Sequence, residues 1–333
     1  MKTTLFTLSI ILLLFASAFD DPNSNLSNSV EVLDSGKTIT FEDDGRVSPI
    51  PNTDELDETE LDQILTLIGY DESYIQNMPL KIKELYASYG GKRVDGEISD
   101  FTHTYVSGDE SYEVTPHNKE EIREKQIEDL QEYNLSENDI NSYNLVDSGN
   151  VLSNSNCDSG TPQGVCSDGI WNARMNAVKV GDRGAQAEYM ISMNFEWEET
   201  PNMTFTDKAG MHWGSYGQPI AGSSYGEIAY YDTSAGEYHY DSLSLDVGSN
   251  YGIGTSFKFW DPLVYRSDRQ GYFHDIIRIS KSDHQFDSLS VSGRYVHPWT
   301  PGISLSIARG GISLSGDIGL SDDWSWRYNF TVE

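Results

Sequence analysis

The strongest constraint on the fold is a two-residue alternation of apolar and polar side chains in the second half of the chain. From Ile191 to Trp197, every second residue is apolar or aromatic and the residues between are polar or acidic. A strand with one buried face shows this period because successive side chains point to opposite faces. The pattern recurs at 243–247, 277–279, 289–291 and 324–332. With Gly-rich turns between them, these segments predict an antiparallel β-sandwich or β-barrel domain over residues 170–333.

A repeated pentapeptide predicts one hairpin within this domain. The sequence Gly-Ile-Ser-Leu-Ser occurs at 302–306 and at 311–315, on either side of Arg309-Gly310. The two arms therefore share one alternation of inward and outward side chains. Alternating serine and apolar residues also resemble a membrane-insertion hairpin, so a β-pore-forming protein is a rival interpretation. The arms are shorter than the roughly 9–11 residues that a membrane strand requires.

Residues 53–133 predict a small helical module, which makes the chain α+β overall. Leu61, Ile64, Leu65 and Ile68 recur at helical spacing, and Gly69 suits a helix end. A second helix is expected from residue 71 to residue 90, interrupted or restarted at residue 79. A third begins at residues 115–116, where a threonine precedes a proline. Between the second and third helices, segments 101–106 and 111–115 predict a small hairpin.

The remaining segments organise the chain into further parts. Residues 19–52 form an acidic lead that we expect to be flexible, and residues 134–169 have the Asn-, Ser-, Asp- and Gly-rich composition of a linker. All seven Trp residues follow that linker. Proteolysis is expected between residues 134 and 156, so the acidic helical part is either a permanent domain or a removable pro-segment.

The first 18 residues predict a cleaved signal peptide. Lys2 precedes an apolar run over residues 5–15, and Ala16-Ser17-Ala18 has the small-x-small form of a cleavage site. The apolar run is shorter than the roughly 20 residues of a spanning helix, and no cysteine follows it for a lipid anchor. We therefore expect a secreted protein, extracellular or associated with the cell wall, with no membrane span.

Two cysteines follow the signal segment. Cys157 and Cys166 enclose eight residues with two Gly and one Pro, a loop that turns back readily. In an oxidising compartment they predict a disulfide, with free thiols as the alternative. In the chain-entropy model so short a loop stabilises by only about 2–3 kcal/mol.

The charge balance excludes some partners. Lys plus Arg number 22 against 53 Asp plus Glu, a formal net charge of −31. Such a polyanion repels phosphate backbones and anionic lipid surfaces, so we expect no nucleic-acid binding.

Four patterns that suggest catalysis or metal binding have simpler explanations. Residues 222–226 match G-x-S-x-G, but a strand pattern follows where the nucleophile elbow needs a helix. Glu196, Glu198 and Glu199 offer carboxylates for glycan hydrolysis, yet Glu196 and Glu198 share the face of a strand expected to be solvated. The histidines show no close ligand pair, so no metal site is assigned. Acid-rich turns at 43–44 and 322–323 are candidates for calcium, and no other cofactor is expected.

Aromatic residues crowd one Gly- and Ser-rich stretch of the β domain. Adjacent Tyr230 and Tyr231 must place their rings on opposite faces of any strand. We therefore expect some rings of this stretch to form an exposed platform, although cross-strand pairs that stabilise the sheet are the alternative. The candidate binding residues are Trp213, Tyr225, Tyr230, Tyr231, Tyr238 and Tyr240.

Three groups of short segments carry a family resemblance. They are Asn-Met-Pro-Leu at 77–80 before the glycines at 90–91, Tyr-Glu-Val-Thr at 112–115 leading into 118–123, and Asp-Gly-Ile-Trp at 168–171 with Phe-Glu-Trp at 195–197. These segments resemble a family of exported proteins from Bacillus-type Gram-positive bacteria. The resemblance implies export to the wall or medium, and it brings no activity and no site residues.

Together these features predict an exported, non-enzymatic binding protein that acts at or outside the cell envelope. The expected partner is neutral or cationic, either a polysaccharide or a cell-wall protein. A secreted glycan hydrolase is the first alternative, and the β-pore-forming protein is the second.

Overall fold

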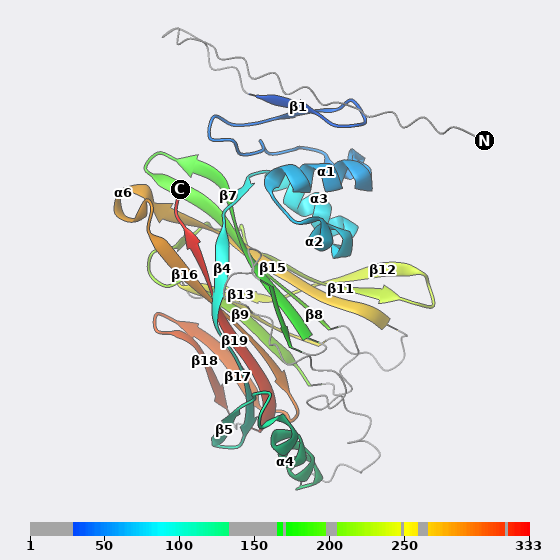
Figure 1. Ribbon diagram of the computed structural model, residues 1–333, viewed down its shortest axis with the longest axis vertical. Helices are drawn as coiled ribbons and strands as arrows, with labels where there is room; N and C mark the ends of the chain where they lie inside the picture. The colour runs from blue at the N-terminus through cyan, green and yellow to red at the C-terminus, as the bar shows by residue number, and fades with distance from the viewer. Residues whose placement is uncertain are drawn as a thin grey trace, which may run out of the picture.

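The computed structural model describes residues 29–132, 165–168, 171–197, 205–247, 250–258, 266–316 and 319–333. Two large antiparallel sheets pack face to face and make up most of the molecule (Figure 1). Sheet I has the order β12 (Glu237–Ser242), β11 (Tyr225–Asp232), β15 (Arg266–Ser280), β8 (Gln186–Trp197), β7 (Trp171–Arg183) and β3 (Lys92–Arg93), with β10 (Gln218–Pro219) on β15 and β6 (Val165–Asp168) on β7. Sheet II has the order β13 (Leu245–Asp246), β14 (Gly252–Phe257), β9 (Asp207–His212), β16 (Ser288–Pro298), β19 (Leu320–Thr331), β4 (Gly96–Ser107) and β5 (Glu110–Glu113).

The core between the sheets consists of the side chains that the alternation placed inward. Ile191 and Phe195 of β8 meet Trp324 and Trp326 of β19 in one buried cluster. The indole of Trp197 donates from Nε1 to the hydroxyl of Tyr295 at 2.8 Å. Aromatic rings of both sheets therefore interdigitate, and the predicted β-sandwich is confirmed.

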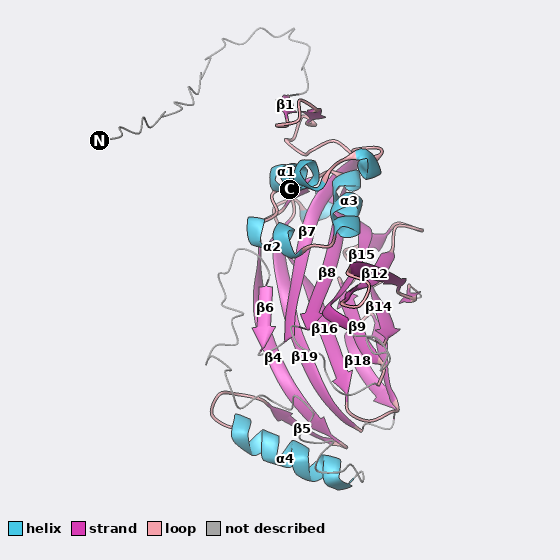
Figure 2. Ribbon diagram, turned by 90° about the vertical axis from the view of Figure 1, so that its right-hand side faces the viewer, coloured by secondary structure: helices cyan, strands magenta, loops and turns pink. Residues whose placement is uncertain are grey.

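A layer of helices covers one part of the outer face of sheet I (Figure 2). It contains η1 (Thr53–Glu55), α1 (Glu58–Ile68), α2 (Glu72–Asn77) and α3 (Leu80–Tyr89). Asp57 caps α1 by accepting from the backbone N–H of Glu60 at 2.9 Å, and Gly69 ends it in the left-handed region at φ 106°. The layer buries Val178 and Met190 of the sheet beneath it.

The N-terminal helices lie close to where the sequence placed them. The second predicted helix is two helices, α2 and α3, separated at Met78-Pro79. The third is α4 (Lys119–Glu132), which begins later than expected because Thr115 and Asn118 form a hydrogen-bonded turn before it. A short α6 (Lys281–His284) follows β15.

Two parts of the first half pair with strands in ways that the sequence analysis did not predict. The expected small hairpin is β4–β5, but it belongs to sheet II, because β4 pairs with β19 from Gly96 to Ser107. Within the lead expected to be flexible, β1 (Val30–Val32) and β2 (Thr38–Thr40) form a two-stranded sheet. Leu33 and Ile39 of this segment are buried against the helical layer.

The outer face of sheet II carries the predicted serine-rich hairpin. β17 (Ile303–Ala308) and β18 (Gly311–Gly316) pair antiparallel, with arms of six residues each. The apolar side chains of Leu305 and Ile307 approach Gly210 and Gly254 of the sheet. At the far end of the sandwich, α4 packs through Ile122 and Leu130 onto Tyr105 and Trp299 (Figure 2).

Several predictions fall outside the described residues. These are the signal peptide at 1–18, most of the linker at 134–169, Cys157, and the candidate carboxylates Glu198 and Glu199. The backbone of Cys166 lies in β6, but its side chain is not described, so the disulfide stays a prediction. In the described part of the chain, no helix combines the length and the apolar character needed to cross a bilayer.

The close approach of β15 to the core predicts a steric cost at Gly271. This residue lies opposite Phe195 in the ladder, and a Cβ atom there would overlap the phenyl ring. We expect Gly271→Ala to lower the free energy of unfolding by about 1–3 kcal/mol in urea titrations. Gly310→Ala is the control, because a Cβ at Gly310 meets no described atom within 4 Å. Equal effects of the two substitutions would contradict this packing.

Candidate functional site

The outer face of sheet I carries rows of polar side chains at the edge of the helical layer. Residues directly opposite one another on neighbouring strands point to the same face, so the pairing register defines these rows. The first row is Asn172, Glu196 and Gln270, and the second is Arg174, Asn194 and Tyr272, each on β7, β8 and β15 in that order.

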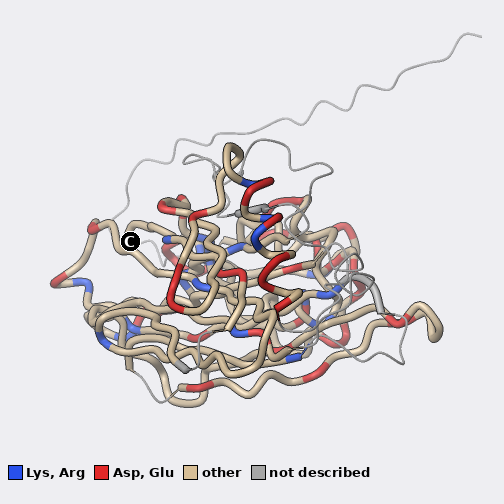
Figure 3. Tube along the Cα trace, turned by 90° about the horizontal axis from the view of Figure 1, so that it is seen from below, with Lys and Arg blue, Asp and Glu red and all other residues tan. Residues whose placement is uncertain are grey.

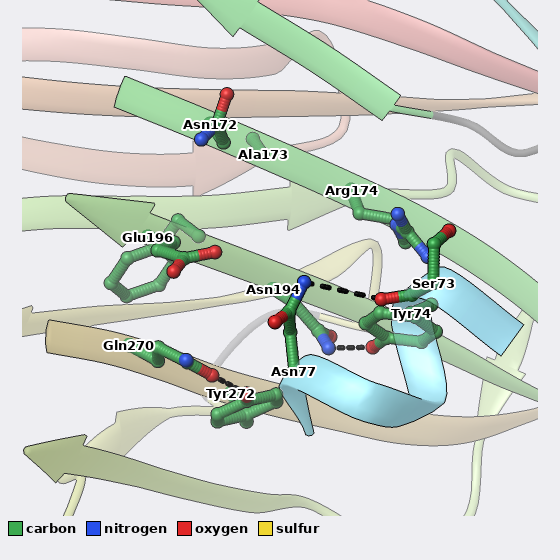
Figure 4. Close-up of a pocket in the computed structure, with 11 residues that line it drawn as sticks. Ser73, Tyr74, Asn77, Asn172, Ala173, Arg174, Asn194, Glu196, Gln270 and Tyr272 are labelled. Atoms are coloured by element: carbon green, nitrogen blue, oxygen red, sulfur yellow. Dashed lines mark hydrogen bonds between the residues drawn. The ribbon is translucent and has the colours of Figure 1, made fainter. Parts of the chain in front are cut away.

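These two rows are the floor of a cavity of about 280 Å³. Helix α2 forms its wall with Ser73, Tyr74 and Asn77, which face the strands (Figure 4). Amides, hydroxyls and two tyrosine rings dominate the lining. In the described part of the lining, Glu196 is the one carboxylate and Arg174 the one cation.

A network of buried hydroxyl and amide groups holds the wall in place. The Asn194 side chain donates to the hydroxyl of Tyr74 and accepts from the hydroxyl of Tyr86 at 3.3 Å. The ring of Tyr70 stacks on Tyr86 with centroids 5.6 Å apart. Burial raises the pKa of Tyr74 well above its usual value, so its hydroxyl stays protonated. The cavity is therefore preformed rather than assembled from loose side chains.

Arg174 lies against this wall and has no ion pair with any described residue. Its guanidinium carbon is 3.9 Å from the centroid of the Tyr74 ring, which is a cation–π contact. The Nη1 atom is buried and has no hydrogen-bond partner. Burial lowers the pKa of Arg174 from its usual value. The side chain nevertheless remains charged at neutral pH, because arginine is effectively always protonated in proteins.

Three of the predicted tyrosines extend the same face beyond the cavity. Tyr240 lies opposite Ala229, which lies opposite Gln270, so this tyrosine continues the first row onto β12. Tyr231 and Tyr238 are direct cross-strand neighbours, and their ring centroids are 5.3 Å apart. The β11–β12 hairpin projects from the side of the sandwich, and Tyr238 is exposed (Figure 1).

Helix α3 is tied to this hairpin by an ion pair. Buried Glu227 pairs with Lys81 and accepts from the hydroxyl of Tyr225 at 2.6 Å. The Lys81 ammonium also lies 5.1 Å from the centroid of the Tyr240 ring. Tyr225 and Tyr240 thus help to hold the helices on the sheet.

Two predicted platform residues belong to the core instead. Trp213 is fully buried between the sheets, and its Nε1 donates to the carbonyl of Asn250 at 3.1 Å. Tyr230 points to the inner face and stacks on His239 with centroids 5.5 Å apart. As expected for adjacent strand residues, Tyr230 and Tyr231 lie on opposite faces. Trp213 and Tyr230 therefore cannot take part in an exposed platform.

The sequence analysis missed the polar floor of the cavity. Asn172, Arg174, Asn194 and Gln270 occupy the polar positions of central strands, and they were not singled out. Glu196 was assigned to a solvated face, whereas it lines the cavity. The sequence did offer one signal. Three of these polar strand positions are amides, whereas a solvated strand face in so acidic a chain would be expected to carry more charged side chains.

The other chemical candidates have ordinary surroundings. β11 begins at Tyr225, so a strand follows the G-x-S-x-G turn. In the acid-rich turns, Asp44 pairs with Arg46 and Lys179, Asp322 accepts from Trp299, and Asp323 pairs with Arg294. Among the residues described, no group of three His, Cys, Asp or Glu side chains is placed to hold a metal ion. Calcium binding stays a prediction.

Comparisons with known proteins give no family. No family model and no curated protein sequence matches the chain. A xylan-binding domain of carbohydrate-binding module family 22 is similar over 34% of this chain and 88% of its own, with 17% identity and a TM-score of 0.18. The C-terminal family 22 carbohydrate-binding module of Clostridium thermocellum Xyn10B gives the same values. AvmM, which catalyses macrocyclization in alchivemycin A biosynthesis, is similar over 44% of this chain and 88% of its own, with 9% identity and a TM-score of 0.16. TM-scores this low carry no argument about the fold or the function.

The different environments of Trp213 and Tyr238 predict different costs of truncation. We expect Trp213→Ala to lower the free energy of unfolding by about 3–5 kcal/mol, because it leaves a cavity in the core. Tyr238→Ala is expected to change it by less than about 1 kcal/mol, since this ring is exposed. Denaturant unfolding of both variants measures the difference, and a comparable loss in Tyr238→Ala would show that the hairpin rings are structural.

Proposed function

We propose that this protein binds a polysaccharide in the cavity on the outer face of sheet I. The observation that carries the proposal is the lining itself, which combines amide, hydroxyl and charged groups with the rings of Tyr74 and Tyr272. Sugars present hydroxyls to polar partners and C–H faces to rings, so such a lining complements them. A volume of about 280 Å³ is near the lower end of the roughly 300–1,000 Å³ of small-ligand sites, which suits one or two sugar units.

The tyrosines of the β11–β12 hairpin extend the proposed site along a chain-like ligand. Tyr240, Tyr231 and Tyr238 continue the face on which the cavity opens. An exposed ring with a polar tip contributes contact area at low conformational cost. A polymer that fills the cavity with one unit would contact these rings with the next, which favours a polysaccharide over a single sugar.

The lining favours binding over hydrolysis. Glycoside hydrolysis ordinarily needs two carboxylates, about 5–5.5 Å apart in retaining enzymes and about 6.5–9.5 Å apart in inverting ones. Glu196 is the one carboxylate among the described residues that line the cavity. The N-terminal segment that predicts secretion would place the protein at the wall or in the medium, where polysaccharides are available.

A bulky side chain at the mouth of the cavity tests the proposal. Ser73 is exposed on α2 and lines the cavity, so Ser73→Trp should block it. We expect binding to a panel of plant and cell-wall polysaccharides, measured by affinity electrophoresis, to weaken at least about tenfold for the polymer that binds best. Gln76→Trp is the control, because Gln76 is exposed on the same helix but outside this cavity. Loss of binding in both variants, or in neither, would argue against this site.

A further inference from the structure

Arg174 differs from several other basic residues of the molecule because it has no acidic partner among the described residues. Arg46, Lys83, Arg278 and Arg294 each pair with at least one carboxylate within 4.0 Å. In a chain with 53 Asp plus Glu against 22 Lys plus Arg, such partners are abundant. Yet within the described residues Arg174 forms no ion pair and no hydrogen bond, and its one close polar contact is with the Tyr74 ring.

The contact with Tyr74 leaves the Nη1 group of the guanidinium without an acceptor among the described residues. A guanidinium has five N–H donors in a planar fork, and a ring face can satisfy none of them as an oxygen acceptor does. A buried donor without an acceptor costs about 1–3 kcal/mol. The Nη1 atom is in that position. The arrangement stacks the fork on a rigid ring at the edge of a cavity, and it leaves the acceptor to be supplied by a ligand.

The charges around Arg174 permit an anionic ligand. The negative charge of Asp71 raises the pKa of Arg174, and the positive charge of Arg93 lowers it. Glu196 lies diagonally opposite Arg174 on the cavity floor. Acidic residues are spread over the rest of the molecule (Figure 3). At physiological ionic strength the Debye length is about 8 Å, so distant carboxylates contribute little to the potential at this site. The net charge of the whole chain therefore does not decide what binds here.

We infer that the polysaccharide is acidic, and that Arg174 binds the carboxylate of a uronic acid unit while the neighbouring amides bind its hydroxyls. This inference rests on the proposed function and replaces the expectation of a neutral or cationic partner. A carboxylate fits the planar fork with two parallel hydrogen bonds, which a hydroxyl cannot form. Asn172 lies two residues from Arg174 on the same face of β7, and Gln270 lies on that face two strands away, on β15.

Matched pairs of glycans test the inference directly. Oligogalacturonate, glucuronoxylan oligosaccharide and hyaluronan oligosaccharide are each compared with their carboxyl-reduced counterparts by isothermal titration calorimetry. For the pair that binds, we expect the acidic member to bind at least about tenfold more tightly, the size expected for charge-assisted hydrogen bonds. Added salt should weaken the acidic member and leave the reduced one nearly unchanged.

Variants of the intact chain assign the preference to Arg174. Arg174→Gln should remove the preference, so that the acidic member binds no more tightly than its reduced counterpart. Arg174→Lys should retain only part of the preference because the fork is lost. Arg278→Gln is the matched control, since Arg278 lies on the same sheet and pairs with Glu188. Melting temperatures establish whether each variant is folded. If a variant does not fold, the comparison of acidic and carboxyl-reduced glycans with the unmodified protein still tests the inference.

The outcomes separate the two proposals. If no polysaccharide of the panel binds, and no glycan of the three pairs binds in its acidic or its reduced form, the proposed function fails and the inference fails with it. If the reduced and acidic members bind equally, the protein binds polysaccharide but the inference about Arg174 is wrong. The same conclusion follows if Arg174→Gln and Arg278→Gln lower the preference equally.

Discussion

The packing of α1–α3 on part of sheet I is the contact on which the rest of the structure depends. The central strands of this sheet are covered on their inner face by the aromatic core and on part of their outer face by the helices. The helices cover the apolar outward residues Val178 and Met190. The polar outward residues Asn172 and Gln270 line the cavity where the helical layer ends. The boundary of the helical layer therefore determines where a cavity can exist.

This origin of the site explains its rigidity. Tyr74 belongs to the helices and Asn194 to the sheet, and their hydrogen bond joins the two layers at the wall of the cavity. Groups held by packing and hydrogen bonds lose little conformational entropy when they bind a ligand, so preorganisation favours affinity. The same layer positions Tyr225 and Tyr240 through Glu227 and Lys81, which couples the hairpin to the helices.

Local patterns predicted the elements, but not how distant segments combine. The alternation at Ile191 and Phe195 identified the core, and Gly69 identified the end of α1, because both signals act within a few residues. The pairing of β4 with β19 joins segments about two hundred residues apart, and no local pattern encodes it. The site was harder to predict. The alternation along a strand shows which side chains share a face, but it does not show which other element covers that face. Glu196 was therefore expected in solvent and lines the cavity, and Trp213 was expected on the surface and lies in the core.

The central claim is that the outer face of sheet I beside α2 binds a glycan. Selective ¹⁵N labelling of side-chain amides tests it most directly, by following these resonances while the best-binding polysaccharide fragment is added. The account predicts that the Asn172 and Gln270 amides shift, while the Asn329 amide, held by Ser99 on sheet II at 2.9 Å, does not. Shifts confined to Asn329 and its surroundings, or a ligand that binds without moving any cavity amide, would contradict it.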